Sequence, residues 1–349
     1  MSRSVETRMG DVRRLLECAR TVHDARAGIA PAIAAASGLT VEGVELGFAS
    51  LEREASDAEL RALVVGAGDA PRVHVVLSAN VFVAPLRAIA LARAAGGRVT
   101  VRPSPRDPTL TRALLQAVAA AGDDALALVD ERDVSSIDSG EVHVYGRDAT
   151  IAAVRARVRP GVVVRGHGSG MGVALVSHGA RMDAAADALA LDVVAFDQRG
   201  CLSPRLAMVI GSAARAEAFA EALHASLRAL GTRIPRGQLF ADERADARRW
   251  RETLAFAGRV WEGADHAVGL APEDSPLQVA PAGRHLTVIP VSSRDAVVAA
   301  LAPVARFVVA VGTDDLGEIG SMAPAHARRS LLGVMQRPPL DGPVDRRSA

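Results

Sequence analysis

The chain has 349 residues, of which 49% are hydrophobic and 23% are charged. This balance is typical of a globular enzyme with more than one packed unit and excludes a disordered chain. A net charge of +1 and an aromatic content of 3% argue against the basic or base-stacking surfaces of nucleic-acid-binding proteins, so we expect no nucleic-acid partner.

Three absences narrow the chemistry further. No apolar stretch is long enough for membrane insertion and the N-terminus has no signal-peptide core, so we expect a cytoplasmic protein. Two cysteines, Cys18 and Cys201, are too few for a disulfide framework or a multi-cysteine zinc site, and we expect no metal. All 41 basic residues are arginine, which excludes lysine Schiff-base chemistry and a Walker-type phosphate loop.

Helical and strand patterns alternate along the chain, which predicts an α/β architecture. The expected elements of the first half are, in chain order, a helix over residues 12–22, strands over 60–65 and 73–77, a helix over 85–95, a strand over 98–102, a helix over 109–121, strands over 125–129 and 142–144, a helix over 149–158 and a strand over 162–164. Residues 165–170 are too rich in glycine for regular structure and predict a loop.

In the second half, a helix is expected over residues 183–194, followed by a loop over 196–204 and a long amphipathic helix over 213–229. Strands are expected over residues 286–290 and 304–311. Residues 336–349 are rich in proline, arginine and aspartate and predict an extended arm or an edge strand.

Cys201 is the first candidate for catalysis, in the segment FDQRGCLSP of residues 196–204. A cysteine between a glycine and a helix start can have its thiolate stabilised by backbone N–H groups and the helix dipole, and Arg199 can add positive charge. The alternative is a small buried hydrophobic residue, which is how we interpret Cys18 in its expected helix.

Asn80 and His167 are the other two candidates. Asn80 follows an expected strand, where its amide can donate to a developing oxyanion, although the sequence alone favours an ordinary turn or helix N-cap. His167 lies between glycines, which let the backbone approach a ligand, and its imidazole can move protons. An exposed histidine in a connecting loop is the alternative, and the loop does not match the dinucleotide-binding fingerprint.

Together these segments resemble the aldehyde dehydrogenase superfamily and, within it, the acyl-CoA reductases of the LuxC type. The resemblance runs from about residue 73 to residue 343 and is clearest over residues 78–108, 142–170, 196–204 and 332–343. Asn80 matches the family's oxyanion-binding asparagine, and Cys201 matches its nucleophile. The resemblance implies a nicotinamide cofactor, NADPH or NADH with NADPH expected, held by Arg102, Pro103, Ser104, Tyr145, Gly146 and Gly168.

The spacing of His167 and Cys201 indicates the direction of the reaction. The two are 34 residues apart (201 − 167), about as far as the water-activating glutamate of hydrolytic aldehyde dehydrogenases lies before the nucleophile. Water would destroy an acyl-enzyme before hydride arrived, so a histidine in place of that glutamate favours reduction. One departure weighs against activity, because the glutamate that usually holds the nicotinamide ribose has no counterpart near residues 284–290.

The resemblance therefore implies NADPH-dependent reduction of a fatty acyl thioester, from acyl-CoA or an acyl-carrier protein, to the aldehyde through an acyl-cysteine. An oxidative NAD(P)-dependent aldehyde dehydrogenase and a non-catalytic, acyl-thioester-binding relative are the alternatives. We expect a Rossmann-type cofactor domain over residues 1–174, with a C-terminal return over 313–349, and an α/β catalytic domain over 175–312. A homodimer without membrane insertion is also implied.

Overall fold

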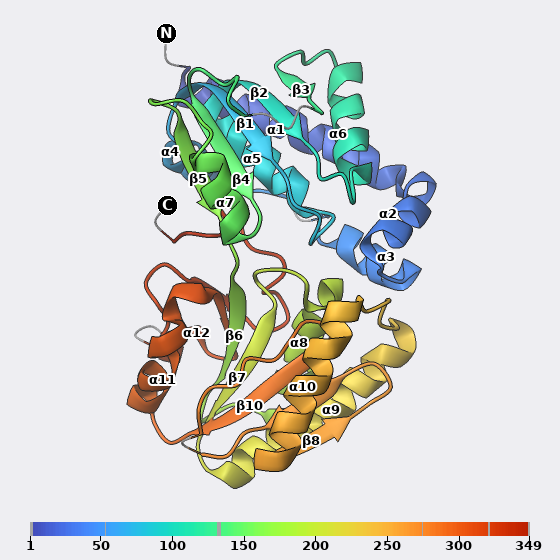
Figure 1. The fold of residues 1–349 in the computed structure, drawn as a ribbon, viewed down its shortest axis with the longest axis vertical. Helices are drawn as coiled ribbons and strands as arrows, with labels where there is room; N and C mark the ends of the chain where they lie inside the picture. The colour runs from blue at the N-terminus through green and yellow to red at the C-terminus, as the bar shows by residue number, and fades with distance from the viewer. Residues whose placement is uncertain (1–2, 53, 131–133, 274, 320–321, 348–349) are drawn as a thin grey trace. The chain divides into compact units, whose positions relative to one another are not determined.

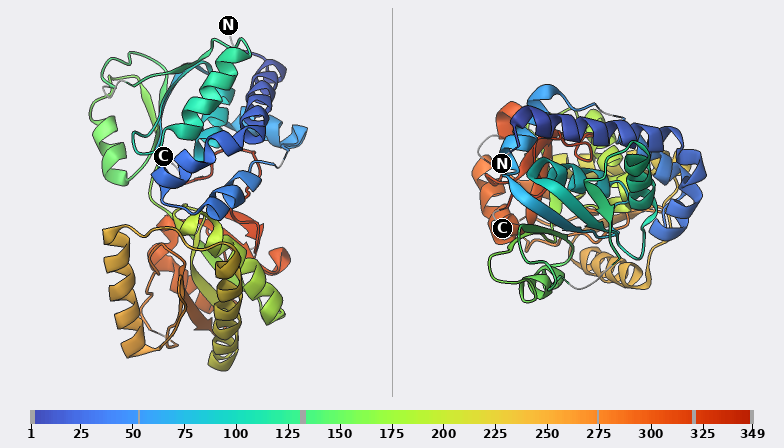
Figure 2. Two further views of the ribbon diagram at one scale, coloured as in Figure 1. Left: turned by 90° about the vertical axis from the view of Figure 1, so that its right-hand side faces the viewer. Right: turned by 90° about the horizontal axis from the view of Figure 1, so that it is seen from above.

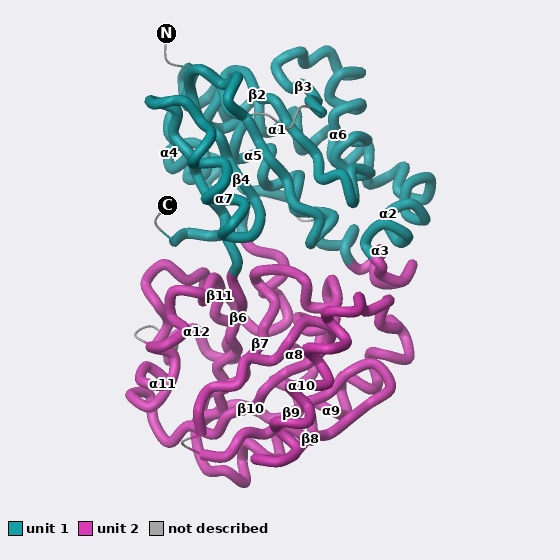
Figure 3. The backbone as a smooth tube through the Cα atoms, in the orientation of Figure 1, with its two compact units in different colours: residues 1–37, 47–169, 339–349 teal, residues 38–46, 170–338 magenta. Residues whose placement is uncertain are grey.

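The computed structural model describes residues 3–52, 54–130, 134–273, 275–319 and 322–347. It divides into two compact units, which Figure 3 colours separately. Unit 1 contains Met1–Ser37, Gly47–Ser169 and Pro339–Ala349, and unit 2 contains Gly38–Leu46 and Gly170–Pro338. Each unit is built around its own β-sheet.

The sheet of unit 1 has five parallel strands in the order β3-β2-β1-β4-β5 (Figure 1). The strands are β1 (Ala70–Val76), β2 (Gly96–Arg102), β3 (Leu126–Leu128), β4 (Glu141–Tyr145) and β5 (Val163–His167). The chain moves outward from β1 to β3 and then returns to the other side of β1. The strand order therefore reverses between β1 and β4, which is where open parallel sheets bind ligands at the carboxyl ends of their strands.

The helices of unit 1 pack on this sheet and on one another. They are α1 (Val5–Asp24), the short η1 (Arg26–Gly28), α2 (Ala30–Ser37), α4 (Asp57–Gly66), α5 (Ala84–Ala95), α6 (Thr109–Ala120) and α7 (Asp148–Arg155). Helices α5, α6 and α7 contact the strands of the sheet. The long helix α1, dark blue in Figure 2, packs on α4, α5 and α6. Helix α5 is rich in alanine and buried along most of its length, because small side chains let it pack against α1 and against β1 and β2.

The sheet of unit 2 has seven strands in the order β12-β11-β6-β7-β10-β9-β8, and all pairs are parallel except β8 with β9. The strands are β6 (Met171–Val176), β7 (Pro204–Ile210), β8 (Arg259–Glu262), β9 (Ala267–Leu270), β10 (His285–Val291), β11 (Val308–Thr313) and β12 (Arg328–Leu331). Every residue of β6, β10 and β11 is buried, as expected for parallel strands covered on both faces.

The helices of unit 2 are α3 (Val41–Ala49), which continues into unit 1, α8 (Met182–Val194), η2 (Ala195–Gln198), α9 (Ala213–Arg233), α10 (Ala241–Ala257), α11 (Arg294–Leu301), η3 (Ala302–Phe307) and α12 (Leu316–Ile319). Trp250 and Leu254 of α10 share one apolar core with Val297 and Leu301 of α11 and with β6 and β7. Helices α8 and α9 pack on each other, and α9 also contacts β7, β9 and β10.

The bounds of the two units differ from those expected. Strand β6 belongs to the second sheet, so unit 1 ends at Ser169 and not at residue 174. Strand β11 pairs with β6 and β12, which keeps residues 313–338 in unit 2, and the chain returns to unit 1 at Pro339 and not at residue 313. The roles of the two domains stay predictions.

Most expected helices and strands are confirmed, but the strand expected over residues 60–65 is wrong and the strand expected over 304–311 is wrong in its first half. Residues 60–65 form part of α4 and not a strand, because Ser56 and Glu59 make a reciprocal capping box that begins a helix. Leu60, Leu63 and Val64 then lie on one buried helical face. Residues 304–307, expected at the start of the strand over 304–311, belong to η3, and β11 begins only at Val308.

The C-terminal residues 336–347 form an arm without strand pairing. Arg87 of α5 donates to the carbonyl oxygens of Pro339 and Gly342 and holds the arm to unit 1. Among the described helices, none is by itself long and apolar enough to cross a membrane, and one bent pair, α2 with α3, meets the length and composition criteria only when taken together.

Candidate active site

The residues predicted to hold a cofactor and two of the predicted catalytic residues, Asn80 and His167, lie at one edge of the unit 1 sheet. We call this set the carboxyl edge of unit 1; it consists of Asn80, which follows β1, Arg102, Pro103 and Ser104 at the end of β2, Tyr145 and Gly146 at the end of β4, and His167 and Gly168 at the end of β5. The edge includes the reversal of strand order between β1 and β4. Cys201 belongs to unit 2.

Asn80 is exposed in the turn after β1. Its side-chain oxygen Oδ1 accepts a hydrogen bond from Nη2 of Arg106 at 3.3 Å. A guanidinium group can only donate, so this contact orients the amide with its oxygen toward Arg106 and its NH2 group away from it. The NH2 group is then able to donate to an oxyanion.

Arg102 brings a positive charge to the end of β2. Burial, and then the charge of Arg102, lower the pKa of His74 to about 4, so His74 is neutral near pH 7. Pro103 and Ser104 are buried, and the chain turns sharply through a bridge between Ser104 and Asp107. An arginine at the end of a strand, next to a tight turn, is suited to a phosphate group.

His167 ends a strand and does not lie in a loop, which corrects the expectation for residues 165–170. Strand β5 continues past residue 164 because it pairs in register with β4, where Tyr145 lies opposite His167. The two rings stack with centroids 4.3 Å apart and planes 14° apart. Burial, and then the charge of His143, lower the pKa of His167 to about 4. The imidazole is therefore neutral near pH 7 and a weak base, and it can act as a hydrogen-bond partner but not as a cationic proton donor.

Gly168 lies where the chain leaves β5 and passes the first turn of α7. A Cβ at this position would overlap Oδ1 of Asp148, and the same oxygen accepts a hydrogen bond from the Ser169 N–H at 3.1 Å. Arg347 of the C-terminal arm donates to the Ser169 carbonyl oxygen at 2.8 Å and pairs with Asp345. Any residue larger than glycine would displace the Asp148 carboxylate from the Ser169 N–H.

In unit 2, Cys201 is half-buried and follows a backbone segment that we call the left-handed turn, Phe196, Asp197 and Gln198. The φ angles of these residues are 54°, 48° and 61°. Left-handed backbone destabilises a residue other than glycine by roughly 1–2 kcal/mol. All three side chains are buried, and such strain persists only where the surrounding contacts fix it.

Asp197 is fixed by an ion pair inside the protein. Its Oδ1 accepts from Nε of Arg284 at 2.8 Å, and its Oδ2 accepts from the Gly237 N–H at 2.9 Å. Arg284 and Asp197 are each only 1% exposed, and Arg284 is itself left-handed, with φ of 66°. The Gly283 N–H also donates to the Asp197 carbonyl oxygen at 3.0 Å. Both the side chain and the backbone of Asp197 are therefore held by the segment that enters β10.

Gln198 ties the turn to the starts of two neighbouring strands. Its Nε2 donates to the carbonyl oxygens of Pro204, at 2.7 Å, and His285, at 2.8 Å. Its Oε1 accepts from the His285 N–H at 2.7 Å. The side chain is fully buried, so each of these bonds replaces a contact with water. Hydrogen bonds of the Gln198 side-chain amide therefore attach the turn to β7 and β10.

Two expectations for the surroundings of Cys201 are wrong. No helix begins after it, because the chain continues from Cys201 into β7 at Pro204, so no helix dipole acts on the thiol from that side. Arg199 does not bring an unbalanced positive charge, because its Nε and Nη2 bind both oxygens of Glu243, at 2.9 and 3.0 Å. Its guanidinium also lies 5.0 Å from the Phe240 ring centroid.

The segment after Cys201 is packed tightly against β6. The Ser203 carbonyl oxygen accepts from the Gly172 N–H at 2.8 Å. A Cβ on Gly172 would overlap the carbonyl oxygen of Leu202. Ser203 is fully buried. Residues on both sides of Cys201 are thus fixed by the sheet.

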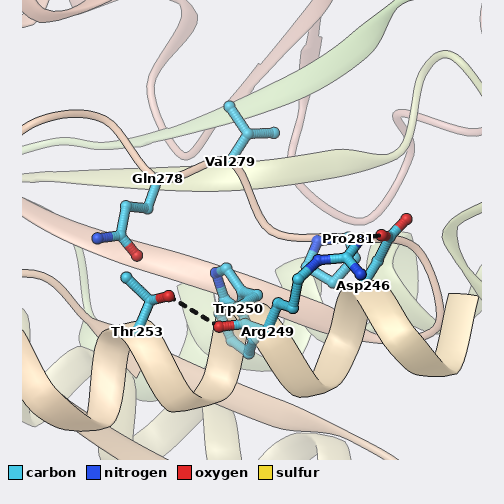
Figure 4. A pocket seen from close by; sticks show the side chains of 7 residues that line it. All are labelled: Asp246, Arg249, Trp250, Thr253, Gln278, Val279 and Pro281. Carbon is cyan, nitrogen blue, oxygen red and sulfur yellow. Dashed lines mark hydrogen bonds and ion pairs between the residues drawn. The ribbon is translucent and has the colours of Figure 1, made fainter.

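A separate hollow lies beside α10 in unit 2, and Figure 4 shows the side chains around it. It is lined by Asp246, Arg249, Trp250, Thr253, Gln278, Val279 and Pro281. None of these is a predicted site residue, and the indole N–H of Trp250 already donates to Oγ1 of Thr287 at 3.0 Å. Within the described part of the chain, no group of three or more histidine, cysteine or acidic residues could hold a metal ion.

The residues that sequence reasoning missed are Asp197, Gln198 and Arg284. Asp197 and Gln198 are polar residues just after an apolar helix, which was a usable signal. Arg284 is 87 residues from Asp197 and follows a glycine in a loop, so no local pattern connects the two.

The sequence matches the family model for acyl-CoA reductase (LuxC) over residues 67–321. No curated protein matches the sequence.

Several solved structures have the same fold. PnpE from Pseudomonas sp. WBC-3 has 16% identity and a TM-score of 0.70, with 93% of this chain and 77% of that chain covered. An NAD-dependent benzaldehyde dehydrogenase from Corynebacterium glutamicum has 15% identity and a TM-score of 0.64, with 93% and 81% covered. A mutant of aldehyde dehydrogenase C from Pseudomonas syringae, solved with NAD+ and octanal, has 16% identity and a TM-score of 0.67, with 94% and 77% covered.

These likenesses confirm the expected fold class, a mixed α/β structure with parallel sheets of the aldehyde dehydrogenase type. The family model covers more than half of the chain and indicates an oxidoreductase of the fatty acyl reductase or aldehyde dehydrogenase type. The chain belongs to the acyl-CoA reductase (LuxC) family.

Proposed function

We propose that the protein reduces a fatty acyl thioester to an aldehyde with NADPH, through an acyl-cysteine formed on Cys201. One observation carries the proposal: Cys201 follows a buried left-handed turn whose polar atoms bind β7, β10 and Arg284. Backbone strain that is fixed in this way is concentrated at catalytic positions. Family membership supplies the reaction class.

The carboxyl edge of unit 1 fits a nicotinamide dinucleotide in three respects. The strand order reverses there, Arg102 supplies a positive charge at the end of β2, and the cap residue of α7, Arg147, makes no side-chain bond to the helix N–H groups. Such N–H groups bind phosphate oxygens. We assign the ribose side to Arg102, Pro103 and Ser104, and the pyrophosphate side to Tyr145, Gly146 and Gly168. A nicotinamide cofactor bound there supplies a hydride.

The first step belongs to Cys201. Its thiolate attacks the acyl thioester carbonyl, the donor thiol leaves, and the acyl group remains on Cys201. We assign Asn80 and the backbone N–H of Cys201 as the oxyanion donors, because the Asn80 NH2 group is oriented away from Arg106. Each such donor stabilises the oxyanion by about 3 kcal/mol.

His167 is proposed as a neutral hydrogen-bond partner and not as an acid. Its pKa of about 4 keeps the ring neutral at the pH of the cell, which disfavours donation to a leaving thiol. Like the predicted reductase chemistry, this assignment has no place for a carboxylate that activates water.

The acyl donor, acyl-CoA or an acyl-carrier protein, and a homodimeric state are proposed from the family alone. Comparing the two donors at equal acyl chain length would separate them. Light scattering would give the mass of the assembly.

The test is NADPH oxidation by the purified protein with acyl-CoAs of several chain lengths, beside Cys201→Ala. We expect wild type to form aldehyde and Cys201→Ala to form none. Equal turnover by the two proteins would exclude Cys201 as the nucleophile. No turnover by wild type, with no binding of NADPH by calorimetry, would favour a non-catalytic relative.

A further inference from the structure

Arg284 lies just before β10 and contacts more of the protein than an ordinary ion pair requires. Its Nε donates to Asp197, its Nη1 donates to the Ile234 carbonyl oxygen at 2.7 Å and to Oδ2 of Asp265 at 3.1 Å, and its Nη2 donates to the Pro235 carbonyl oxygen at 3.2 Å. All three guanidinium nitrogens are used. The planar guanidinium group has N–H donors that reach acceptors in these several directions. The compact ammonium group of a lysine cannot reach all of them.

The contacts join the left-handed turn to the linker between α9 and α10. Asp265, which shares the guanidinium with Asp197, also accepts from the Arg236 N–H at 3.2 Å. Burial raises the pKa of Asp265, but the hydrogen bond of His266 and the charge of Arg284 lower it overall. Arg284 therefore contacts two carboxylates, those of Asp197 and Asp265.

The strain and the ion pair meet at one residue. Asp197 is the middle residue of the left-handed turn, and its carboxylate has one oxygen on Arg284 and the other on the Gly237 N–H. A φ of 48° is unfavourable for an aspartate, so we expect these contacts to stabilise Asp197 in this conformation. The rest of the path to Cys201 is short, since the Arg199 N–H bonds the Phe196 carbonyl oxygen at 3.1 Å.

We propose that Arg284 is the positioning residue of the nucleophile: it holds Asp197, and through it the left-handed turn, in the one conformation that presents Cys201 to the acyl carbonyl. The assignment rests on the proposed function of Cys201. Arg284 acts through Asp197 and touches no reacting atom. Its role is therefore to raise the rate of acyl transfer and not to bind substrate.

The experiment replaces Arg284 and measures catalysis and loop order separately. Arg284→Met should lower kcat for acyl-CoA reduction by about a hundredfold, the loss expected when a reacting group is displaced by about an ångström, and leave KM within about twofold. In the same protein, hydrogen exchange of the peptide that contains residues 196–203 should become faster, while peptides from β6 and β10 keep their protection.

Arg215→Met is the matched control. Arg215 is an arginine of the same unit whose Nη2 donates to the carbonyl oxygens of Ser177 and Ala180, at 2.9 and 3.1 Å, and not to the turn. We expect it to lower the melting temperature without changing kcat or exchange in residues 196–203. Equal losses of kcat in the two variants would mean that Arg284 acts only on stability and would overturn the proposal.

A second variant covers the case in which Arg284→Met does not fold. Arg284→Lys keeps the buried charge but not the guanidinium group, and we expect kcat to fall by about tenfold or more with faster exchange of the turn. A folded Arg284→Lys protein with wild-type kcat and wild-type exchange would overturn the positioning role. If wild type reduces no acyl-CoA, the proposed function fails, and the exchange measurements still decide whether Arg284 holds the turn.

Discussion

The carboxyl edge of unit 1 and the left-handed turn of unit 2 hold their polar groups in opposite ways. At the edge, Asn80 is exposed and is held by a contact of 3.3 Å with Arg106. In the turn, Asp197 and Gln198 are buried and have left-handed backbone. Both polar atoms of each side chain make hydrogen bonds. Substrate and cofactor must enter and leave, so a group proposed to contact them, such as Asn80, is accessible, whereas a nucleophile gains rate from being fixed. The comparison therefore distinguishes residues that stay accessible to ligands from residues that hold the backbone near the nucleophile in one conformation.

The sharpest test of this contrast is the stability of two matched substitutions. Gln198→Leu removes bonds to the Pro204 and His285 carbonyl oxygens and to the His285 N–H inside the protein, so we expect a loss of about 3 kcal/mol or more in the free energy of unfolding. Asn80→Leu at the exposed edge should lose no more than about 0.5 kcal/mol. Urea unfolding followed by circular dichroism measures both, and equal losses would remove the contrast.

At Asn80 we expect a large effect on catalysis and little effect on stability. Asn80→Ala should lower kcat by about a hundredfold or more, because one oxyanion donor is lost, and should leave the melting temperature unchanged. Steady-state kinetics beside thermal unfolding is the measurement. A wild-type kcat would remove Asn80 from the site.

Arg106 should have a smaller effect of the same kind. Arg106→Met frees the Asn80 amide to rotate, so only a fraction of molecules present the NH2 group, and we expect kcat to fall by about tenfold. The double variant with Asn80→Ala should be no slower than Asn80→Ala alone. Additive losses in the double variant would show that Arg106 acts independently of Asn80.

Acid should affect the two units unequally. Burial is the first cause that lowers the pKa values of His74 and His167 in unit 1, and of His285 in unit 2, from 6.5 to about 4. At these three histidines the unfolded chain binds more protons between about pH 4 and 6.5, so the stability that they contribute is complete above pH 6.5 and is lost as the pH drops toward 4. We expect unit 1, with two such histidines, to lose hydrogen-exchange protection first. His167→Gln should reduce the pH dependence of unfolding, and an unchanged slope would contradict the assignment.

Much of the carboxyl edge was predictable because it depends on local patterns. Parallel strands end in polar residues at one edge, so Asn80 was found from the apolar run that precedes it. Arg102 and Tyr145 were predicted from the resemblance to the reductase family and not from the pattern alone. His167 was placed in a loop because its glycine neighbours masked the pairing of β5 with β4, which only the tertiary structure supplies.

The left-handed turn was not predictable in the same way. Its conformation is opposed by the intrinsic preference of Phe196, Asp197 and Gln198, and it exists because Arg284 and His285, distant in sequence, bind them. Arg199 was misread for the same reason, since its partner Glu243 is 44 residues away. The prediction of a strand over residues 60–65 was wrong for a local reason, because the capping box at Ser56 was overlooked.

The most direct test of the central claim is to trap the acyl-enzyme. The protein is incubated with acyl-CoA in the absence of NADPH, digested at low pH and analysed by mass spectrometry. We predict one acyl group on the peptide that contains Cys201 and none on the peptide that contains the buried Cys18. An unmodified Cys201 peptide under conditions in which the protein reduces acyl-CoA, or an acyl group elsewhere that turns over as aldehyde forms, would contradict the account.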